Sequence, residues 1–249
     1  MILFGYELVT LIIIWIAVFI AGIIRGYSGF GFAMVAVTSM SLVLLPAQVV
    51  PVVLILEVLA SFRLIPQVWR KIDWYSLRWL LTGSFFAIPL GVYFLATIPA
   101  EPMRIFISIL VLIAAVLLLS GWAWRRMPAR PLILTTGVAC GLLNGAAAIG
   151  GPPVILFYLS SPAGVAVSRA SIIAYFLGID VISLVMASIQ GLTTIETFRL
   201  TLIALLPLLL GITLGSRMFK NVNEKAFRKH VLILLIVLAM IGLTKGLLS

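Results

Sequence analysis

The sequence predicts an all-helical membrane protein that crosses the bilayer many times. Hydrophobic residues make up 63% of its 249 residues and charged residues only 10%. Soluble domains carry about 25% charged residues, so a chain this apolar is expected to fold in lipid. Its apolar runs are helix-sized and lack the alternation of a β-strand. Its net charge of +10 comes from basic residues that gather in alternate loops, as in a multipass protein with a fixed orientation.

A membrane-spanning helix needs about 20 apolar residues, and the chain divides into ten runs near that length. The runs are expected at 2–24, 28–45, 47–65, 77–98, 103–124, 131–145, 146–162, 165–189, 198–218 and 230–248. The first lacks the basic n-region of a signal peptide, so we expect it to be a retained helix. The two runs that meet in residues 144–153 are short, so they form either two crossings or a re-entrant pair.

Basic residues predict the orientation of the chain. If the N-terminus lies outside, all of the 17 basic residues except Arg104, Arg199 and Lys245 fall on the cytoplasmic side. This asymmetry is the positive-inside pattern, and it places both termini outside the cytoplasm. Orientation and contact with anionic lipid account for the basic loops, so we do not expect nucleic acid as a partner.

The chain also repeats itself, which predicts a first transmembrane repeat over 1–124 and a second over 131–249. A shift of 120 residues carries Gly31 onto Gly151 and Gly91 onto Gly211. Each half holds an odd number of expected segments, so the halves must enter the membrane in opposite directions. Inverted repeats are typical of secondary transporters, which bind substrate between the halves near the membrane midplane.

Each repeat contains a glycine-rich break, one at residues 25–32 and the other at residues 144–153. Glycine permits unusual backbone angles, and proline suits the first turn of a new helix. An unwound segment followed by a helix start presents free amides that attract an anion. We therefore expect discontinuous or re-entrant helices that bind an anion. The alternative is that the glycines only let helices pack closely.

The paired breaks, the Gly150-Gly151-Pro152-Pro153 motif and the Ser168-Arg169-Ala170-Ser171 run together resemble the sulfite exporter TauE/SafE family of membrane permeases. The resemblance implies export or exchange of small anions, including sulfite and organosulfonates such as sulfoacetate, across the bacterial cytoplasmic membrane. The first break reads Gly29-Phe30-Gly31-Phe32, where the family commonly has adjacent glycines. This departure leaves the particular anion open.

The expected anion ligands come from both breaks and from the run that follows the second. Backbone amides and small polar groups would donate hydrogen bonds, and the Arg169 guanidinium can bind a sulfonate through two parallel ones. The expected substrate-binding residues are Ser28, Gly29, Phe30, Gly31, Asn144, Gly150, Gly151, Pro152, Ser168, Arg169 and Ser171.

Two carboxylates, Glu57 and Asp180, lie near the middle of expected helices. A carboxylate is costly inside lipid, so it normally faces a partner, a cavity or an ion path. Either residue could carry a proton or cation coupled to anion movement. The alternative is an ion pair that locks helices together, although Arg63, six residues after Glu57, is off its helical face.

The residue content favours a transporter over an enzyme. The chain has a single His230 and a single Cys140, and it lacks zinc-protease, nucleophile-elbow, dinucleotide and phosphate-loop motifs. We expect no cofactor and no metal. The expected partners are a small anion and the lipid bilayer, with proton coupling as an option. A passive anion channel and a membrane subunit of a larger complex are the alternatives, and the oligomeric state is left open.

Overall fold

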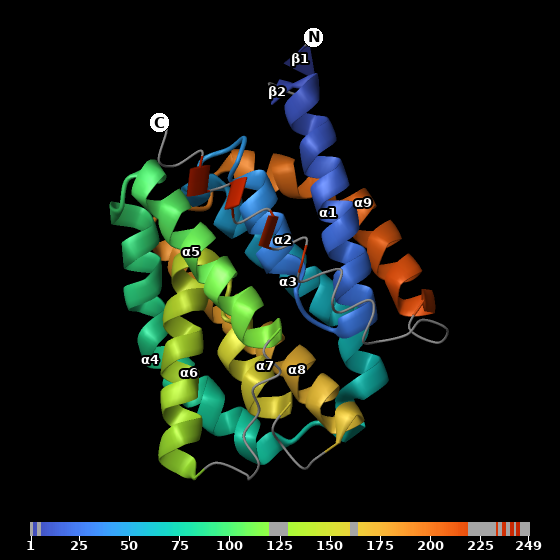
Figure 1. Ribbon diagram of the computed structural model, residues 1–249, viewed down its shortest axis with the longest axis vertical. Helices are drawn as coiled ribbons and strands as arrows, with labels where there is room; N and C mark the ends of the chain where they lie inside the picture. Colours follow the sequence, from blue (N-terminus) through green and yellow to red (C-terminus); the bar gives the residue numbers. More distant parts are fainter. Residues whose placement is uncertain are drawn as a thin grey trace.

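The computed structural model describes residues 2–3, 6–119, 129–159, 164–218 and scattered positions from 233 to 244. Within these residues the fold is all-helical apart from a small hairpin of β1 (Ile2–Leu3) and β2 (Tyr6–Glu7). The helices are α1 (Leu8–Ser28), α2 (Phe32–Met40), α3 (Pro46–Val68), α4 (Trp74–Thr97), α5 (Ala100–Leu119), α6 (Arg130–Ala147), α7 (Gly151–Leu159), α8 (Val165–Ile189) and α9 (Ile195–Met218) (Figure 1). A 3-10 turn, η1 (Trp69–Lys71), follows α3. The expected segment at 230–248 lies largely outside the described residues.

Six of the described helices are long and apolar enough to cross a membrane, namely α1, α3, α4, α5, α8 and α9. Large apolar side chains point outward from the bundle, including Phe86 at 74% and Leu202 at 72% exposure. A soluble protein rarely displays so much apolar surface, whereas lipid solvates it. The prediction of an all-helical multipass membrane protein is confirmed.

The helices α2 and α7 are much shorter than the runs expected at 28–45 and 146–162. Each has nine residues, or about 14 Å of helix, against about 30 Å of hydrocarbon. Gly29 and Gly31 take φ values of 82° and 89°, which separates α1 from α2. Extended backbone at Leu45, which precedes Pro46, separates α2 from α3. A left-handed Ala148, with φ 55°, ends α6 before the prolines that start α7.

Both short helices lie in the interior. Every residue of α2 is buried, and α7 is buried along most of its length. The breaks that precede them are therefore enclosed by the longer helices. Neither short helix can be a full crossing by itself.

The longest helix contacts join the first part of the chain to the second: α1 packs along α9, and α4 packs along α6 (Figure 1). Glycines allow both approaches. A Cβ on Gly26 would overlap the Ile212 carbonyl, and one on Gly91 would overlap the Leu142 carbonyl. Small residues of this kind let helix backbones come close together in membranes. Packing therefore explains these two glycines, whereas Gly29 and Gly31 are needed for their backbone angles.

Candidate functional site

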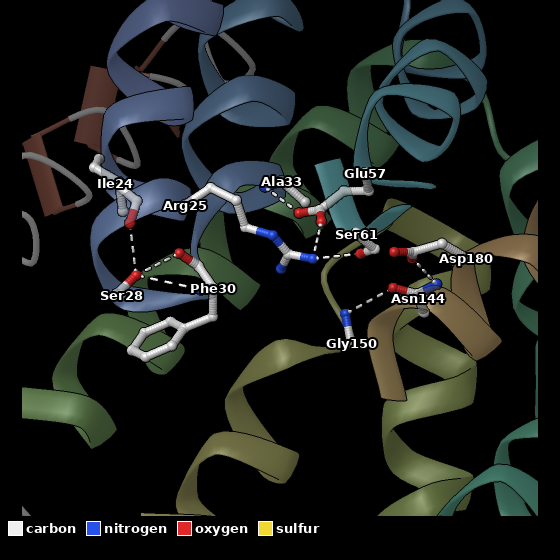
Figure 2. A network of polar contacts seen from close by, with 10 residues as sticks. All are labelled: Ile24, Arg25, Ser28, Phe30, Ala33, Glu57, Ser61, Asn144, Gly150 and Asp180. Atoms are coloured by element: carbon white, nitrogen blue, oxygen red, sulfur yellow. Dashed lines mark hydrogen bonds and ion pairs between the residues drawn. The ribbon is translucent and has the colours of Figure 1, made fainter. Parts of the chain in front are cut away.

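The first break is held in shape by its own polar groups. The backbone amide of Gly29 donates to the Arg25 carbonyl at 2.8 Å. The Ser28 hydroxyl oxygen lies 2.7 Å from the carbonyl oxygens of Ile24 and Phe30, and it accepts from the Phe30 amide at 3.2 Å. Ser28 thus closes the end of α1 and fixes the loop that leads to α2 (Figure 2).

A buried ion pair joins this break to α3. Nη2 of Arg25 lies 2.9 Å from Oε2 of Glu57 and donates to the Ser61 hydroxyl at 2.7 Å. The other carboxylate oxygen of Glu57 accepts from the Ala33 amide, in the first turn of α2, at 3.2 Å. The side chains of Arg25 and Glu57 are 0% and 2% exposed. Glu57 therefore binds α1 and α2 at once, and both groups are removed from solvent (Figure 2).

Arg25 keeps further hydrogen-bonding capacity. Its Nε and Nη1 atoms are buried and have no hydrogen-bond partner within the described residues. The guanidinium lies 4.9 Å from the ring centroid of Phe176, which covers one face. Buried donors without acceptors destabilise a fold, so in native structures they rarely lack a partner such as a water molecule or a bound ion. An oxyanion that takes two parallel hydrogen bonds from Arg25 would pair one of these donors with the neighbouring Nη2 atom.

The second break carries a related cluster. The Asn144 side chain donates from Nδ2 to Oδ1 of Asp180 and to the Ser183 hydroxyl, each at 3.0 Å. Its Oδ1 atom accepts from the Gly150 amide at 3.2 Å. Oδ2 of Asp180 is buried and has no hydrogen-bond partner in the described part of the chain. The amide of the second break is thus held by a side-chain oxygen, as the Ala33 amide is held by Glu57.

The two clusters have the same plan. Arg25 is the first residue of the first break and binds a carboxylate and a serine of α3, while Asn144 is the first residue of the second break and binds a carboxylate and a serine of α8. Asp180 is close enough to Glu57 and Arg25 to interact with both electrostatically, and Figure 2 shows the two clusters side by side. The breaks therefore meet at one polar centre inside an apolar bundle.

Arg169, on α8, reaches the first break from the second part of the chain. Its Nη2 atom donates to the Gly26 carbonyl at 3.2 Å. The aliphatic part of its side chain packs against Gly29, where an added Cβ would lie 3.1 Å from Cγ of Arg169. Arg169 also interacts electrostatically with Arg25. Two guanidinium groups from different parts of the chain thus gather at one break.

The sequence profile described as Sulfite exporter TauE/SafE matches residues 14–241. The chain belongs to the sulfite exporter TauE/SafE family. This match confirms the resemblance carried by the glycine-rich breaks, and members of the family are membrane transporters rather than enzymes. No curated protein and no solved structure matches the chain significantly.

In this TauE/SafE protein, most of the expected site residues lie in or beside the breaks. Gly31 immediately precedes α2, and Phe30 is half-buried beside it. Gly150 packs against the Cys140 carbonyl and Asn144, and Gly151 packs against the Phe176 ring. Pro152 is buried in the first turn of α7.

Two expected residues have structural contacts elsewhere. The Ser168 hydroxyl donates to the Tyr158 carbonyl of α7 at 3.0 Å. The Ser171 hydroxyl accepts from the Asp73 amide, before α4, at 2.8 Å. These bonds fasten α8 to its neighbours.

Sequence reasoning explained Arg25 as a residue at the cytoplasmic boundary and did not include it among the expected site residues. The residue lies in the last turn of α1 with its side chain wholly buried. A positive charge at the end of an apolar run is also what a membrane boundary looks like in a sequence, so the pattern gave no sign that Arg25 is buried. One signal in the sequence could have indicated this position. If Glu57 forms an ion pair inside the membrane, its partner must be an arginine other than Arg63, which is off its helical face. Ser61 and Ser183, each on the helix of a buried carboxylate, were also missed.

Proposed function

We propose that this protein is a secondary transporter that exports or exchanges small anions of the sulfite or organosulfonate type, such as sulfoacetate. Family membership supports the transport of a sulfite-type anion. The observation that carries the proposal is Arg25, whose buried Nε and Nη1 donors lack partners among the described residues at the first break. A guanidinium binds sulfur and carboxylate oxyanions through two parallel hydrogen bonds.

The anion would bind where the two breaks meet. Arg25 and Arg169 supply positive charge, and the starts of α2 and α7 supply backbone amides. The Ala33 and Gly150 amides already donate to oxygens of Glu57 and Asn144. An oxyanion that replaced one of these oxygens would receive the same hydrogen bond. Ser28, Gly29, Phe30 and Gly31 shape the first side of this site, and Asn144, Gly150, Gly151 and Pro152 shape the second.

The mechanism would be alternating access between two inverted repeats, residues 1–124 and 131–249. Each repeat begins with a long helix, a break and a nine-residue helix. The first helix of each packs on the fourth helix of the other, as α1 on α9 and α6 on α4. Gly91 and Gly211, related by the 120-residue shift, occupy corresponding contacts in these pairs. These correspondences support rocking of one repeat against the other around a central site.

The membrane would be the bacterial cytoplasmic membrane, with both termini outside. The inside-negative potential then favours anion export by about 2.3 kcal/mol per charge per 100 mV. The orientation can be tested by adding one cysteine at a time, since Cys140 is buried. Exposed positions suit the probe, so Gln190→Cys should react with an impermeant thiol reagent on intact spheroplasts. Lys71→Cys, also exposed, should react only after the cells are opened.

The function is tested by thermal unfolding of detergent-purified protein with sulfite, sulfoacetate, sulfate or carboxylates. A ligand that binds only the folded state raises the melting temperature. We expect a sulfur oxyanion to stabilise the protein selectively, and Arg25→Gln and Arg169→Gln to lose the shift. Arg199→Gln should keep it, because Arg199 is exposed and pairs with Glu196. If no anion stabilises the wild type and reconstituted vesicles show no anion flux, the proposal fails. Flux without saturation or counterflow would indicate a channel instead.

A further inference from the structure

We propose that Glu57 is a tethered counter-anion, which occupies the donors of the anion site in the empty transporter and gives them up when substrate binds. The inference rests on the proposed anion transport and assigns a step of it to one residue. By neutralising Arg25 when no substrate is present, Glu57 allows the empty protein to reorient. It therefore decides whether the transporter can catalyse net flux or only exchange.

The contacts of Glu57 are those expected of a bound oxyanion. One carboxylate oxygen lies 2.9 Å from Nη2 of Arg25, and the other accepts from the Ala33 amide at 3.2 Å. A guanidinium and an amide at a helix start are the two donors that best bind a small anion. An anion that bound Arg25 through two parallel hydrogen bonds would pair the free Nε or Nη1 atom with Nη2, the atom that Glu57 contacts, so it would weaken the hold of Glu57 on it.

A counter-charge is required because the site is closed to solvent. Arg25 is 0% exposed, and an unpaired charge in this setting is strongly unfavourable. During exchange the substrate supplies the negative charge in both directions. During net transport the protein must return empty, and only a charge of its own can then neutralise Arg25.

The other charged groups that face this site do not replace Glu57. Asp180 interacts electrostatically with Arg25, but its Oδ1 atom is bound to Asn144 across the second break. Arg169 adds positive charge and bonds to the Gly26 carbonyl. In the second cluster an asparagine stands where the first has arginine, so among the described residues Asp180 has no ion pair of the kind that Glu57 forms. Within the described residues, Glu57 is the carboxylate in direct contact with Arg25.

The test compares net efflux with exchange in proteoliposomes that contain the full chain. Vesicles loaded with radiolabelled sulfite are diluted into sulfite-free buffer for net efflux, or into buffer with unlabelled sulfite for exchange. Sulfoacetate serves as a second probe. Glu57→Gln removes the charge but keeps an oxygen that can accept from the Ala33 amide. Glu196→Gln is the matched control, because Glu196 pairs with Arg199 away from the breaks.

The wild type and Glu196→Gln should perform both reactions. Glu57→Gln should retain exchange but lose net efflux by about tenfold or more, because the empty site then holds an uncompensated charge. Sulfite should also raise the melting temperature of Glu57→Gln more than that of the wild type, since the anion replaces the missing carboxylate. Glu57→Asp keeps the charge on a shorter side chain. It should therefore lower net efflux and increase the sulfite-induced rise in melting temperature, each by a smaller amount than Glu57→Gln.

Net efflux by Glu57→Gln at the wild-type rate would overturn the inference and leave anion transport intact. If Glu57→Gln lost both net efflux and exchange, the test would rest on the melting temperatures. A sulfite-induced rise in the melting temperature of Glu57→Gln no larger than that of the wild type would then refute the inference. If Glu57→Gln did not fold, Glu57→Asp with an unchanged ratio of net efflux to exchange would refute it. Absence of flux and of anion binding in the wild type would instead contradict the proposed function, and the inference with it.

Discussion

Gly91 of α4 faces Gly145 of α6 so closely that a Cβ on Gly91 would lie 3.0 Å from Cα of Gly145. The pair of α1 and α9 has a matching contact, in which a Cβ on Gly22 would lie 3.2 Å from Cα of Gly211. Backbones that approach this closely gain dispersion contacts that larger residues would prevent. The two contacts join helices that occupy equivalent places in the proposed repeats.

If the repeats are equivalent, Gly91→Ala and Gly211→Ala should destabilise the protein to a similar extent. We expect a loss of about 1–3 kcal/mol for each, because the added methyl group overlaps backbone atoms that cannot move away singly. Reversible unfolding in mixed micelles, followed by tryptophan fluorescence, measures it. Gly178→Ala is the control, since its methyl group meets mainly the flexible end of Leu81. A large cost at one site and none at the other would argue against the equivalence.

The buried ion pair predicts that Arg25→Gln alone is more harmful to stability than the double variant Arg25→Gln/Glu57→Gln. The single change leaves Glu57 as an uncompensated buried charge, which costs about 3–5 kcal/mol. The double change removes both charges, so we expect it to recover at least part of this loss. The free energy of unfolding for the two singles and the double gives the coupling between the residues.

Arg199→Gln is a suitable reference for this experiment. Arg199 also contacts a glutamate, but its side chain is 63% exposed. Exposed pairs contribute about 0–1 kcal/mol, so this variant should unfold almost as the wild type does. Equal losses for Arg25→Gln and Arg199→Gln would mean that the pair of Arg25 and Glu57 is solvated.

Asn144→Leu should both destabilise the protein and lower its anion transport. The change keeps a similar shape but leaves the Gly150 amide and Oδ1 of Asp180 without partners, at about 1–3 kcal/mol for each buried group. Ser183→Ala, which removes one hydrogen bond to Asn144, should have a smaller effect. Ser188→Ala serves as the control, because this exposed hydroxyl bonds only within its own helix in the described structure. Normal stability of Asn144→Leu would contradict the hydrogen-bond network.

The sequence predicted the class of the fold and the places of both breaks, because composition and glycine are local signals. Gly29 and Gly31 permit the positive φ that the structure has there, and Pro152 suits the first turn of the helix that follows the second break. The lengths of α2 and α7 were harder to predict, since the apolar runs continue beyond the helices. An interior turn is as apolar as an interior helix, so hydropathy does not separate them.

The partners within the site depend on contacts between distant segments, which no local pattern contains. Arg25 is 32 positions from Glu57, and Arg169 bonds to a carbonyl 143 positions away. The positive-inside rule counted Arg25 as a loop residue because the rule responds to charge near a segment end. Its real environment is determined by tertiary packing, which brings Glu57 of α3 and Phe176 of α8 against its side chain.

The left-handed backbone of the first break predicts a graded response to substitution at Gly31. Left-handed angles cost an alanine about 1–2 kcal/mol, whereas asparagine tolerates them better. A Cβ at Gly31 would in addition lie 3.0 Å from Cγ2 of Ile24. The free energy of unfolding should therefore fall least for Gly31→Asn, more for Gly31→Ala, and most for Gly31→Val, whose side chain is β-branched.

Gly191 separates the two causes, because its φ of 73° is also left-handed and a Cβ there would meet nothing within 4 Å. Gly191→Ala should incur the backbone cost alone, so Gly31→Ala should be the more destabilised variant. Transport should also fall for Gly31→Ala and persist for Gly191→Ala, since Gly31 positions the Ala33 amide that Glu57 binds. If the two alanine variants had equal stability and equal flux, the geometry of the first break would not control the anion site.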